Sequence, residues 1–223
     1  MYTCHAAMFD MDGTLVDSLA DLADSANEVM RSFGAAEHTT EEYRYFVGNG
    51  AKKLMERALP QDLAADAATV NEALTRYKKI YRERHLLTKT KPYPGIEELL
   101  AKLKEKNIPC AVLTNKPHEA ALVIADKLFP AAFCAVVGDK PNRPRKPDPT
   151  NALIIAKDMG VAPSAVAYFG DSDADMLLAN NAGFVPVGVL WGFRPREELS
   201  ANGAKILLNH PDDIFTEINF VGK

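Results

Sequence analysis

The sequence predicts an α/β protein, a doubly wound parallel sheet with an inserted α-helical domain. From Ile96 onward, short apolar runs alternate with amphipathic segments, which is typical of a parallel sheet with right-handed crossovers. The predicted strands are nearly continuous apolar runs, as expected when helices cover both faces of a sheet. Between Asp17 and Arg84, apolar residues recur only at helical spacing, which indicates an all-helical insertion after the first strand.

The first expected strand is the apolar run Ala6–Phe9. The insertion begins with Leu15–Phe33, where apolar residues recur at steps of three and four and Gly34 ends the pattern. Further helices are expected at Glu41–Phe46, Ala51–Leu59 and Leu63–Arg84. The basic segment Leu86–Gly95, which carries two prolines, is expected to be the linker back to the sheet.

After this linker the elements alternate. The expected helices are Ile96–Lys106, His118–Lys127, Thr150–Met159 and Ala174–Ala182. The expected strands are Cys110–Leu113, Phe133–Val137, Ala165–Phe169, Val185–Leu190 and a short edge strand at Ala204–Leu208. The stretch Asp139–Pro149 is rich in Pro, Lys and Arg, which favours a functional loop. Residues 1–16 with 87–223 are therefore expected to form an α/β core domain, and residues 17–86 a helical domain.

Composition excludes several classes of function. The 223 residues carry 26 basic and 30 acidic side chains, so no broad basic face for nucleic acid is indicated. No apolar run approaches the roughly 18 residues of a membrane span, and the N-terminus lacks a basic leader. Two of the three cysteines lie in apolar runs, which favours buried thiols in a reducing compartment. We expect a cytoplasmic monomer or homodimer without nucleic-acid or membrane partners.

The first strand ends in a pair of carboxylates. Asp10 and Asp12 are two residues apart, so in an extended chain their side chains point to the same side. Like charges this close require a positive partner, which is a divalent cation, a lysine or both. Gly13 allows a sharp turn, and N–H groups beside it, including that of Thr14, can face an anion.

Other polar residues close the later strands. Thr114 and Asn115 follow one apolar run, Asp171 follows another, and Lys146 lies in the functional loop. Each alone has an ordinary explanation, such as a turn, a strand end or a surface lysine. Sites in parallel α/β sheets lie beyond the carboxyl ends of the strands. Because all these residues fall at that one predicted edge, in chain order, a shared site is favoured.

These residue types suit phosphoryl transfer. Asp10 can attack phosphorus as a nucleophile and form an aspartyl-phosphate, which divides a difficult hydrolysis into two steps. Asp12 can protonate the leaving alkoxide and then act as base for water. The Thr114 hydroxyl and an Asn115 amide N–H can bind the phosphoryl oxygens, and Lys146 can pair with Asp10 and the phosphate.

The same acids indicate a magnesium site. Mg²⁺ favours oxygen ligands with few carboxylates and retained water. Asp10 and Asp171 are the natural ligands, with Asp175 behind or beside them, and the main-chain carbonyl of Asp12 can add a third oxygen. The expected partner is a small phosphorylated metabolite.

This ordered set resembles the haloacid dehalogenase superfamily over essentially the whole chain. Asp10–Thr14 matches its first motif, Thr114 the second, Lys146 the third, and Gly170-Asp171 with Asp175 the fourth. The resemblance implies a Rossmann-like core, a helical cap that closes over substrate, and the roles given above. The second aspartate, Asp12, is typical of the superfamily's phosphatases and phosphomutases, whereas its dehalogenases lack it.

Within the superfamily the chain is most similar to the phosphoglycolate phosphatase group. The similarity extends over Phe9–Ser18, Val47–Ala51, Leu113–Pro117, Lys146–Pro149 and Val189–Phe193, and includes Arg44. It implies hydrolysis of 2-phosphoglycolate to glycolate and phosphate, with Gly48 and Gly50 contacting the substrate. Asp173-Ala174 departs from the group, which tends to carry a basic residue and Asn there.

Two alternatives remain open at this point. The first keeps the superfamily and changes the reaction, as a sugar phosphatase or a phosphomutase like β-phosphoglucomutase. The second is a receiver-like, phospho-accepting signalling module, which also places Asp, Thr, Lys and Mg²⁺ on a parallel sheet. The helical insertion and Asp12 argue against a receiver.

Overall fold

The computed structural model describes residues 1–222, and the chain divides into two compact units. One comprises Met1–Val16 and Pro92–Lys223, and the other Asp17–Lys91. The return crossing therefore lies at 91–92, later than the boundary at 86–87 that the sequence indicated. The reason is Asp21, which accepts hydrogen bonds from the main-chain N–H groups of Lys89 and Thr90 at 3.0 and 2.8 Å. These bonds attach the segment to the helical unit.

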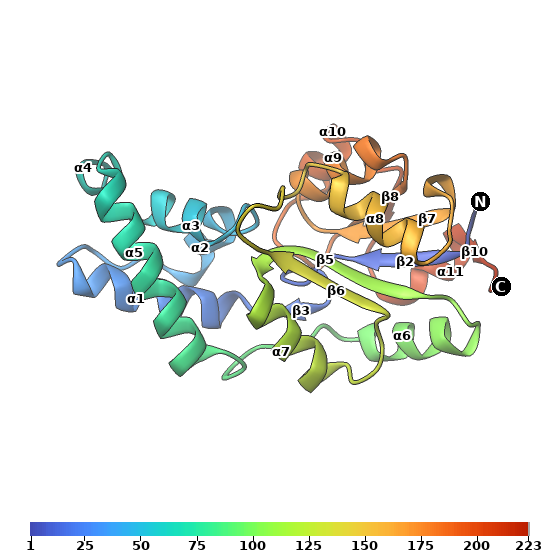
Figure 1. Cartoon of the computed structure of the whole chain (residues 1–223), viewed down its shortest axis with the longest axis horizontal. Coiled ribbons are helices and arrows are strands. Elements are labelled where there is room, and N and C mark those ends of the chain that lie inside the picture. The colour runs from blue at the N-terminus through green and yellow to red at the C-terminus, as the bar shows by residue number, and fades with distance from the viewer. Residues whose placement is uncertain (223) are drawn as a thin grey trace. The chain divides into compact units, whose positions relative to one another are not determined.

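The core unit is built on a six-stranded sheet in the order β6-β5-β2-β7-β8-β9 (Figure 1). Every neighbouring pair in it is parallel. The strands are β2 (Ala6–Phe9), β5 (Cys110–Pro117), β6 (Ala135–Asp139), β7 (Val166–Gly170), β8 (Val185–Val189) and β9 (Ile206–Leu208). This confirms the predicted parallel α/β sheet, including its short last strand at the edge.

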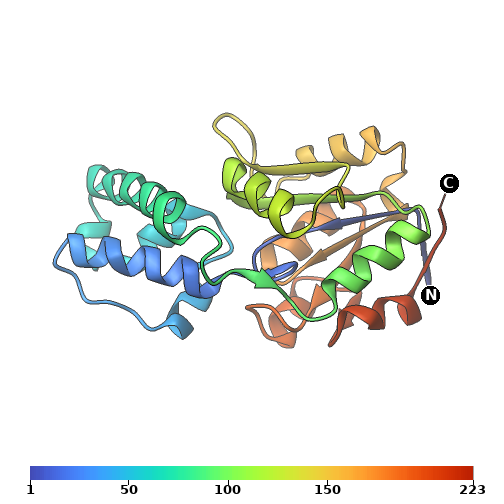
Figure 2. The ribbon, with the colours of Figure 1, turned by 90° about the horizontal axis from the view of Figure 1, so that it is seen from below.

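Helices cover both faces of this sheet. In Figure 1, α6 (Ile96–Glu105) and α7 (His118–Leu128) lie below it, and α8 (Thr150–Asp158) and α9 (Asp173–Ala182) lie above; Figure 2 views the α6 and α7 side. The chain steps in one direction from β2 to β5 and β6, and in the other from β7 to β8. Right-handed crossovers in opposite directions place the helices on opposite faces. The unit also contains two three-residue helical turns, η2 (Pro163–Ala165) and η3 (Pro211–Asp213), and two short helices, α10 (Arg196–Ala201) and α11 (Ile214–Glu217).

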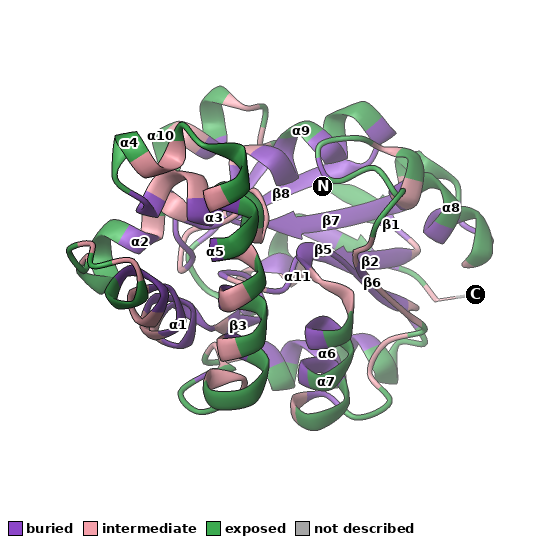
Figure 3. Ribbon diagram, turned by 60° about the vertical axis from the view of Figure 1, so that its left-hand side comes forward, coloured by how far each residue is buried: buried purple, intermediate pink, exposed green. Residues whose placement is uncertain are grey.

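The central strand β2 is buried on both faces, as its apolar run predicts (Figure 3). Met8 packs with Tyr168 in the cluster formed with α8 and α9. The next residue, Phe9, stacks on Phe169 with ring centroids 4.5 Å apart. Successive side chains of a strand point to opposite faces, so each residue of β2 packs on one face of the sheet.

A second small sheet was not predicted. β1 (Tyr2–Cys4) pairs in parallel with β10 (Ile218–Phe220), which brings the two chain ends together (Figure 1). Three-residue segments with partly exposed side chains give no periodicity that distinguishes them from loops. Cys4 and Cys110 are buried, as expected of thiols in a core, whereas Cys134 is exposed. Within residues 1–222, no helix has both the length and the apolar character to cross a membrane.

The helical unit consists of helices and one π-helical turn. They are α1 (Leu19–Ser32), α2 (Thr40–Phe46), α3 (Ala51–Ala58), α4 (Gln61–Ala64), α5 (Ala67–Ile80) and the turn η1 (Tyr81–His85). The helix expected over Leu63–Arg84 is confirmed from Ala67 onward, but its start is wrong, because Leu63 belongs to the separate helix α4. Asp66 begins a new helix because its side chain accepts hydrogen bonds from the N–H groups of Ala68 and Thr69. Strands β3 (Val16–Asp17) and β4 (Lys91–Pro92) pair with each other where the chain passes between the units.

Candidate active site

The carboxyl edge of the sheet gathers the polar residues that the sequence singled out. Asp10 follows β2, Asp171 follows β7, and Thr114 lies within β5. Phe9 is in register with both Val112 of β5 and Phe169 of β7, so β5 and β7 flank the end of β2. All three polar residues are buried.

Lys146 arrives from the loop after β6 and lies between two acids. Its Nζ is 2.8 Å from Oδ1 of Asp10 and 2.7 Å from Oδ1 of Asp175. Burial by itself would lower the pKa of Lys146, but Asp10 and Asp175 raise that pKa above its usual value. The ammonium is therefore charged at neutral pH and offsets part of the negative charge of the site.

Asp10, Asp171 and Asp175 form a tight cluster. Each contributes a carboxylate oxygen, and these oxygens all lie within 4.8 Å of one another. Burial raises the pKa of Asp10, although Lys146 lowers it. Burial, Asp175 and Asp10 together raise the pKa of Asp171. A cation is therefore favoured at this place, and a set of carboxylate oxygens is the kind of donor set that Mg²⁺ binds.

The acids of the cluster differ in how far their oxygens are already occupied. Asp175 accepts from Lys146 and Tyr168 at Oδ1, and from the N–H and hydroxyl of Ser172 at Oδ2. Its contact with Ser172 also caps the start of α9. A carboxylate oxygen has two lone pairs, so Asp175 has little capacity left for a metal.

Asp171 keeps more of its capacity. Its Oδ1 accepts from the Thr14 hydroxyl at 3.2 Å, and its Oδ2 accepts from the main-chain N–H of Phe193 at 2.8 Å. One lone pair on each oxygen remains. The arrangement fits Asp10 and Asp171 as direct metal ligands and Asp175 as a group that orients Lys146.

Asp12 has a partner that the sequence did not predict. Lys116 places its Nζ 2.8 Å from Oδ1 and 3.1 Å from Oδ2 of Asp12. The available signal was position: Lys116 lies two residues after Thr114, and β5 runs to Pro117, past the expected end at Leu113.

Asn115 has a different environment from the one expected. Its Oδ1 accepts from the main-chain N–H of Lys146 at 3.0 Å, and its Nδ2 donates to the carbonyl of Lys146 at 3.3 Å. The side chain therefore fixes the loop that carries Lys146. A contact between Asn115 and a phosphoryl oxygen stays a prediction.

Gly13 and Thr14 build the turn of the first motif. The Gly13 N–H donates to the carbonyl of Val16 at 3.0 Å, and the Thr14 N–H donates to that of Met11 at 3.3 Å. An anion would have to compete with these acceptors, so the expected substrate contact of both residues stays a prediction. Gly13 has a φ of 82°, and a Cβ there would overlap the Asp171 carboxylate.

The segment after β8 supports this turn, which the sequence did not indicate. Trp191 Nε1 donates to the carbonyl of Thr14 at 3.0 Å. At Gly192, a Cβ would overlap both the Asp171 side chain and the carbonyl of Gly13. Together with the Phe193 N–H on Asp171, these contacts hold the end of β7 against the first motif.

Gly48 and Gly50 belong to the helical unit. Both have positive φ, 104° and 87°, and Gly50 directly precedes α3. Arg44 forms an ion pair with Glu41 at 2.8 Å. The expected contacts of these two glycines with substrate stay predictions.

Comparisons with known proteins give a consistent result. The family described as "Haloacid dehalogenase-like hydrolase" matches residues 7–189. "Phosphoglycolate phosphatase" of Neisseria meningitidis is 35% identical over 202 residues, which cover 89% of this chain and 86% of that protein. "Phosphoglycolate phosphatase 1" of Pseudomonas aeruginosa is 31% identical over 93% of this chain and 77% of its own length. The crystal structure of a predicted phosphoglycolate phosphatase from Haemophilus somnus superposes with a TM-score of 0.88 at 26% identity, covering 97% of this chain and 99% of that one.

Proposed function

The chain belongs to the haloacid dehalogenase-like hydrolases and is a phosphatase, and from this premise we propose that it hydrolyses 2-phosphoglycolate through an aspartyl-phosphate on Asp10. The observation that carries the mechanism is the buried Asp10 beside Lys146, with Asp12 two residues further along. Because the chain belongs to a family of hydrolases, the receiver-like alternative has no support.

In the first step an Asp10 carboxylate oxygen bonds to phosphorus, and the bond from phosphorus to the ester oxygen of the substrate breaks. Asp12 gives that oxygen a proton, so the product leaves as an alcohol. In the second step Asp12 takes a proton from water, which attacks the aspartyl-phosphate and releases inorganic phosphate. Asp10 then returns to its ionised form and Asp12 to its protonated form.

Other residues stabilise charge on the transferring group. We assign the Thr114 hydroxyl and the Lys146 ammonium to the phosphoryl oxygens, because both groups lie beside the Asp10 carboxylate. When bound, Mg²⁺ would be held by Asp10, Asp171 and the Asp12 carbonyl, and would neutralise charge on the phosphoryl oxygens.

The substrate assignment rests on the relatives. Two proteins named phosphoglycolate phosphatase match most of the chain. Gly48 and Gly50, at the start of α3, are the groups we assign to substrate contact in the helical unit. Specificity within phosphatases depends on such contacts, so the substrate requires a direct measurement.

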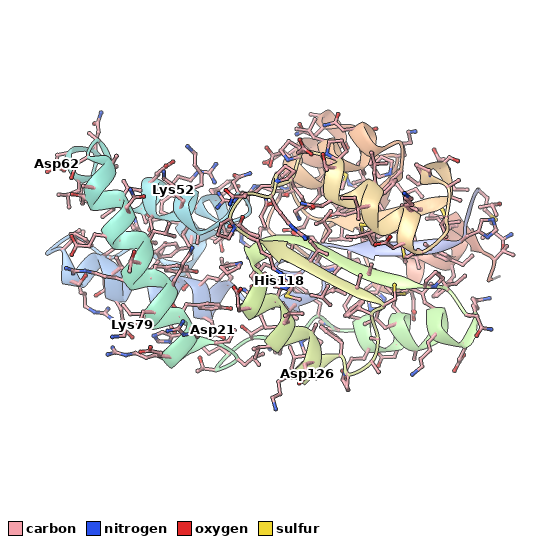
Figure 4. The ribbon with its side chains drawn as sticks, in the orientation of Figure 1. Asp21, Lys52, Asp62, Lys79, His118 and Asp126 are labelled. Carbon is pink, nitrogen blue, oxygen red and sulfur yellow. The ribbon has the colours of Figure 1, made fainter. Side chains whose placement is uncertain are left out.

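The test is product analysis with purified protein and Mg²⁺. Wild type should release glycolate and inorganic phosphate from 2-phosphoglycolate at a higher kcat/KM than from hexose phosphates. Asp10→Asn should abolish phosphate release. After reaction with phosphate-labelled substrate and an acid quench, wild-type protein should carry the label and Asp10→Asn should not. Asp126→Asn, an exposed position on α7 (labelled in Figure 4), serves as the matched control and should leave turnover unchanged. An isomeric sugar phosphate as product, or turnover by Asp10→Asn, would contradict the proposal.

A further inference from the structure

Lys116 is a buried cation whose charge the proposed mechanism does not use. Its side chain is 1% exposed, and its Nζ contacts both carboxylate oxygens of Asp12. We propose that Lys116 is a positioning residue, which holds the Asp12 carboxyl group in the orientation that delivers a proton to the leaving oxygen and pairs with the carboxylate that remains after this transfer. This inference rests on the proposed function, because it acts through the acid that the proposal assigns to Asp12.

The two ends of Lys116 are held differently from those of a surface lysine. Its main-chain N–H donates to the Thr114 hydroxyl oxygen at 3.2 Å, inside strand β5. Its main chain is therefore fixed to Thr114, at the irregular part of the β5–β6 pairing, while its ammonium meets a side chain that comes from another segment. A contact to both oxygens restricts rotation of the Asp12 carboxyl group, which a contact to one oxygen would leave freer.

Asp12 needs such support more than its neighbours do. Its side chain is 19% exposed, compared with 7% for Asp10 and 0% for Asp175. Because water can reach the Asp12 side chain, the contact of Lys116 with both of its oxygens limits the rotamers that this side chain can adopt. Burying an ammonium costs several kcal/mol, and apolar residues of similar size commonly replace buried ion pairs without loss of stability. A charge retained here is thus better explained by orientation of Asp12 than by folding.

The two lysines of the site have separate partners. Lys146 contacts Asp10 and Asp175, whereas Lys116 contacts Asp12. Loss of Lys116 should therefore impair proton delivery and leave the nucleophile in place. That separation leads to a test based on the leaving group.

The first experiment compares Lys116→Met with wild type on two substrates. The glycolate alkoxide requires a proton on departure, whereas 4-nitrophenolate leaves without one. Since a positioned general acid contributes about 10² to 10⁴ in rate, we expect kcat/KM for 2-phosphoglycolate to fall by about 100-fold and that for 4-nitrophenyl phosphate by less than about 10-fold. Lys116→Arg keeps the charge and should recover part of the loss with 2-phosphoglycolate.

The second experiment is a double-mutant cycle with Asp12→Asn. If Lys116 acts through Asp12, adding Lys116→Met to Asp12→Asn should change kcat/KM for 2-phosphoglycolate by less than about threefold. Lys102→Met, a partly exposed lysine on α6, is the control and should behave as wild type. Thermal unfolding of each variant reports whether it is folded.

The outcomes separate the two hypotheses. Equal losses on both substrates in folded Lys116→Met, or additive losses in the cycle, would overturn the positioning role and leave the phosphatase intact. Wild-type protein that releases phosphate from neither substrate would overturn the proposed function, and this inference with it. If Lys116→Met does not fold, Lys116→Arg compared across the two substrates decides the same question, since a guanidinium placed differently from the ammonium should affect only 2-phosphoglycolate.

Discussion

Charge compensation in the site is local and uneven. Lys146 pairs with Asp10 and Asp175, and Lys116 pairs with Asp12. Asp171 instead receives neutral donors from Thr14 and Phe193. The position of Asp171 therefore depends on main-chain and hydroxyl groups, and on the glycines that let the chain approach it.

Gly192→Ala tests this close approach. The added methyl group would overlap Asp171 and the carbonyl of Gly13, so one of them must move. Because a displacement of about 1 Å can cost roughly 100-fold in rate, we expect kcat to fall by at least that factor. Steady-state kinetics at saturating Mg²⁺ checks this.

Gly34→Ala is the control for that variant. Gly34 has a φ of 67°, and a methyl group added there would meet no described atom within 4 Å beyond Gly34 and its two chain neighbours. Alanine at this position should cost about 1 kcal/mol in unfolding free energy through backbone strain, with kcat unchanged. A Gly192→Ala enzyme of wild-type kcat would show that the contact with Asp171 is not needed.

At the scale of elements, the buried side chain of Asp21 on α1 binds the segment after η1. Asp21 (labelled in Figure 4) accepts hydrogen bonds from Thr88, Lys89 and Thr90, and it is fully buried. Burial alone would raise the pKa of Asp21, but these hydrogen bonds lower it below its usual value. These hydrogen bonds attach the segment to α1 and explain why the helical unit extends to Lys91.

Asp21→Asn should therefore destabilise the protein by about 1.5 to 3 kcal/mol at pH 7, because an amide cannot accept all these bonds. A carboxyl with a depressed folded pKa stabilises above its unfolded pKa, about 4, and this contribution is lost as pH falls through the lower folded value. The difference between wild type and Asp21→Asn should thus shrink below about pH 4.

Urea unfolding across pH measures this difference. Asp24→Asn is the matched control on the same helix, since its ion pair with Lys89 is exposed and should contribute at most about 1 kcal/mol. An Asp21→Asn protein as stable as Asp24→Asn at pH 7 would contradict this account.

At the scale of the whole molecule, the site joins residues that are far apart in the chain. Asp10 and Asp171 come from different strands, and their carboxylate oxygens lie within 4.8 Å only because β2 and β7 are neighbours. An unfolded chain does not hold these oxygens together. A cation that binds this site therefore binds the folded state and stabilises the whole molecule.

Mg²⁺ should accordingly raise the unfolding temperature. At a concentration 100 times its Kd, the added stability is about 2.7 kcal/mol, which corresponds to roughly 5 to 10 °C for a chain of this length. Asp171→Asn should abolish most of this shift, whereas Asp173→Asn, in the first turn of α9 and outside the cluster, should retain it. Equal shifts in both variants would place the metal elsewhere.

By itself, the sequence determined the parallel sheet, the helical insertion, the positions of Asp10, Thr114 and Asp171 after apolar strand runs, and that of Lys146 in the Pro-, Lys- and Arg-rich loop, because apolar periodicity and loop composition are local properties. Only the tertiary structure decided four other contacts. Lys116 pairs with Asp12, and Asn115 binds the main chain of Lys146. Gly192 packs against Asp171, and Asp21 accepts hydrogen bonds from residues 88–90. Each of these contacts joins segments distant in the chain, and the partner of a buried charge depends on which segments the fold brings within about 3 Å.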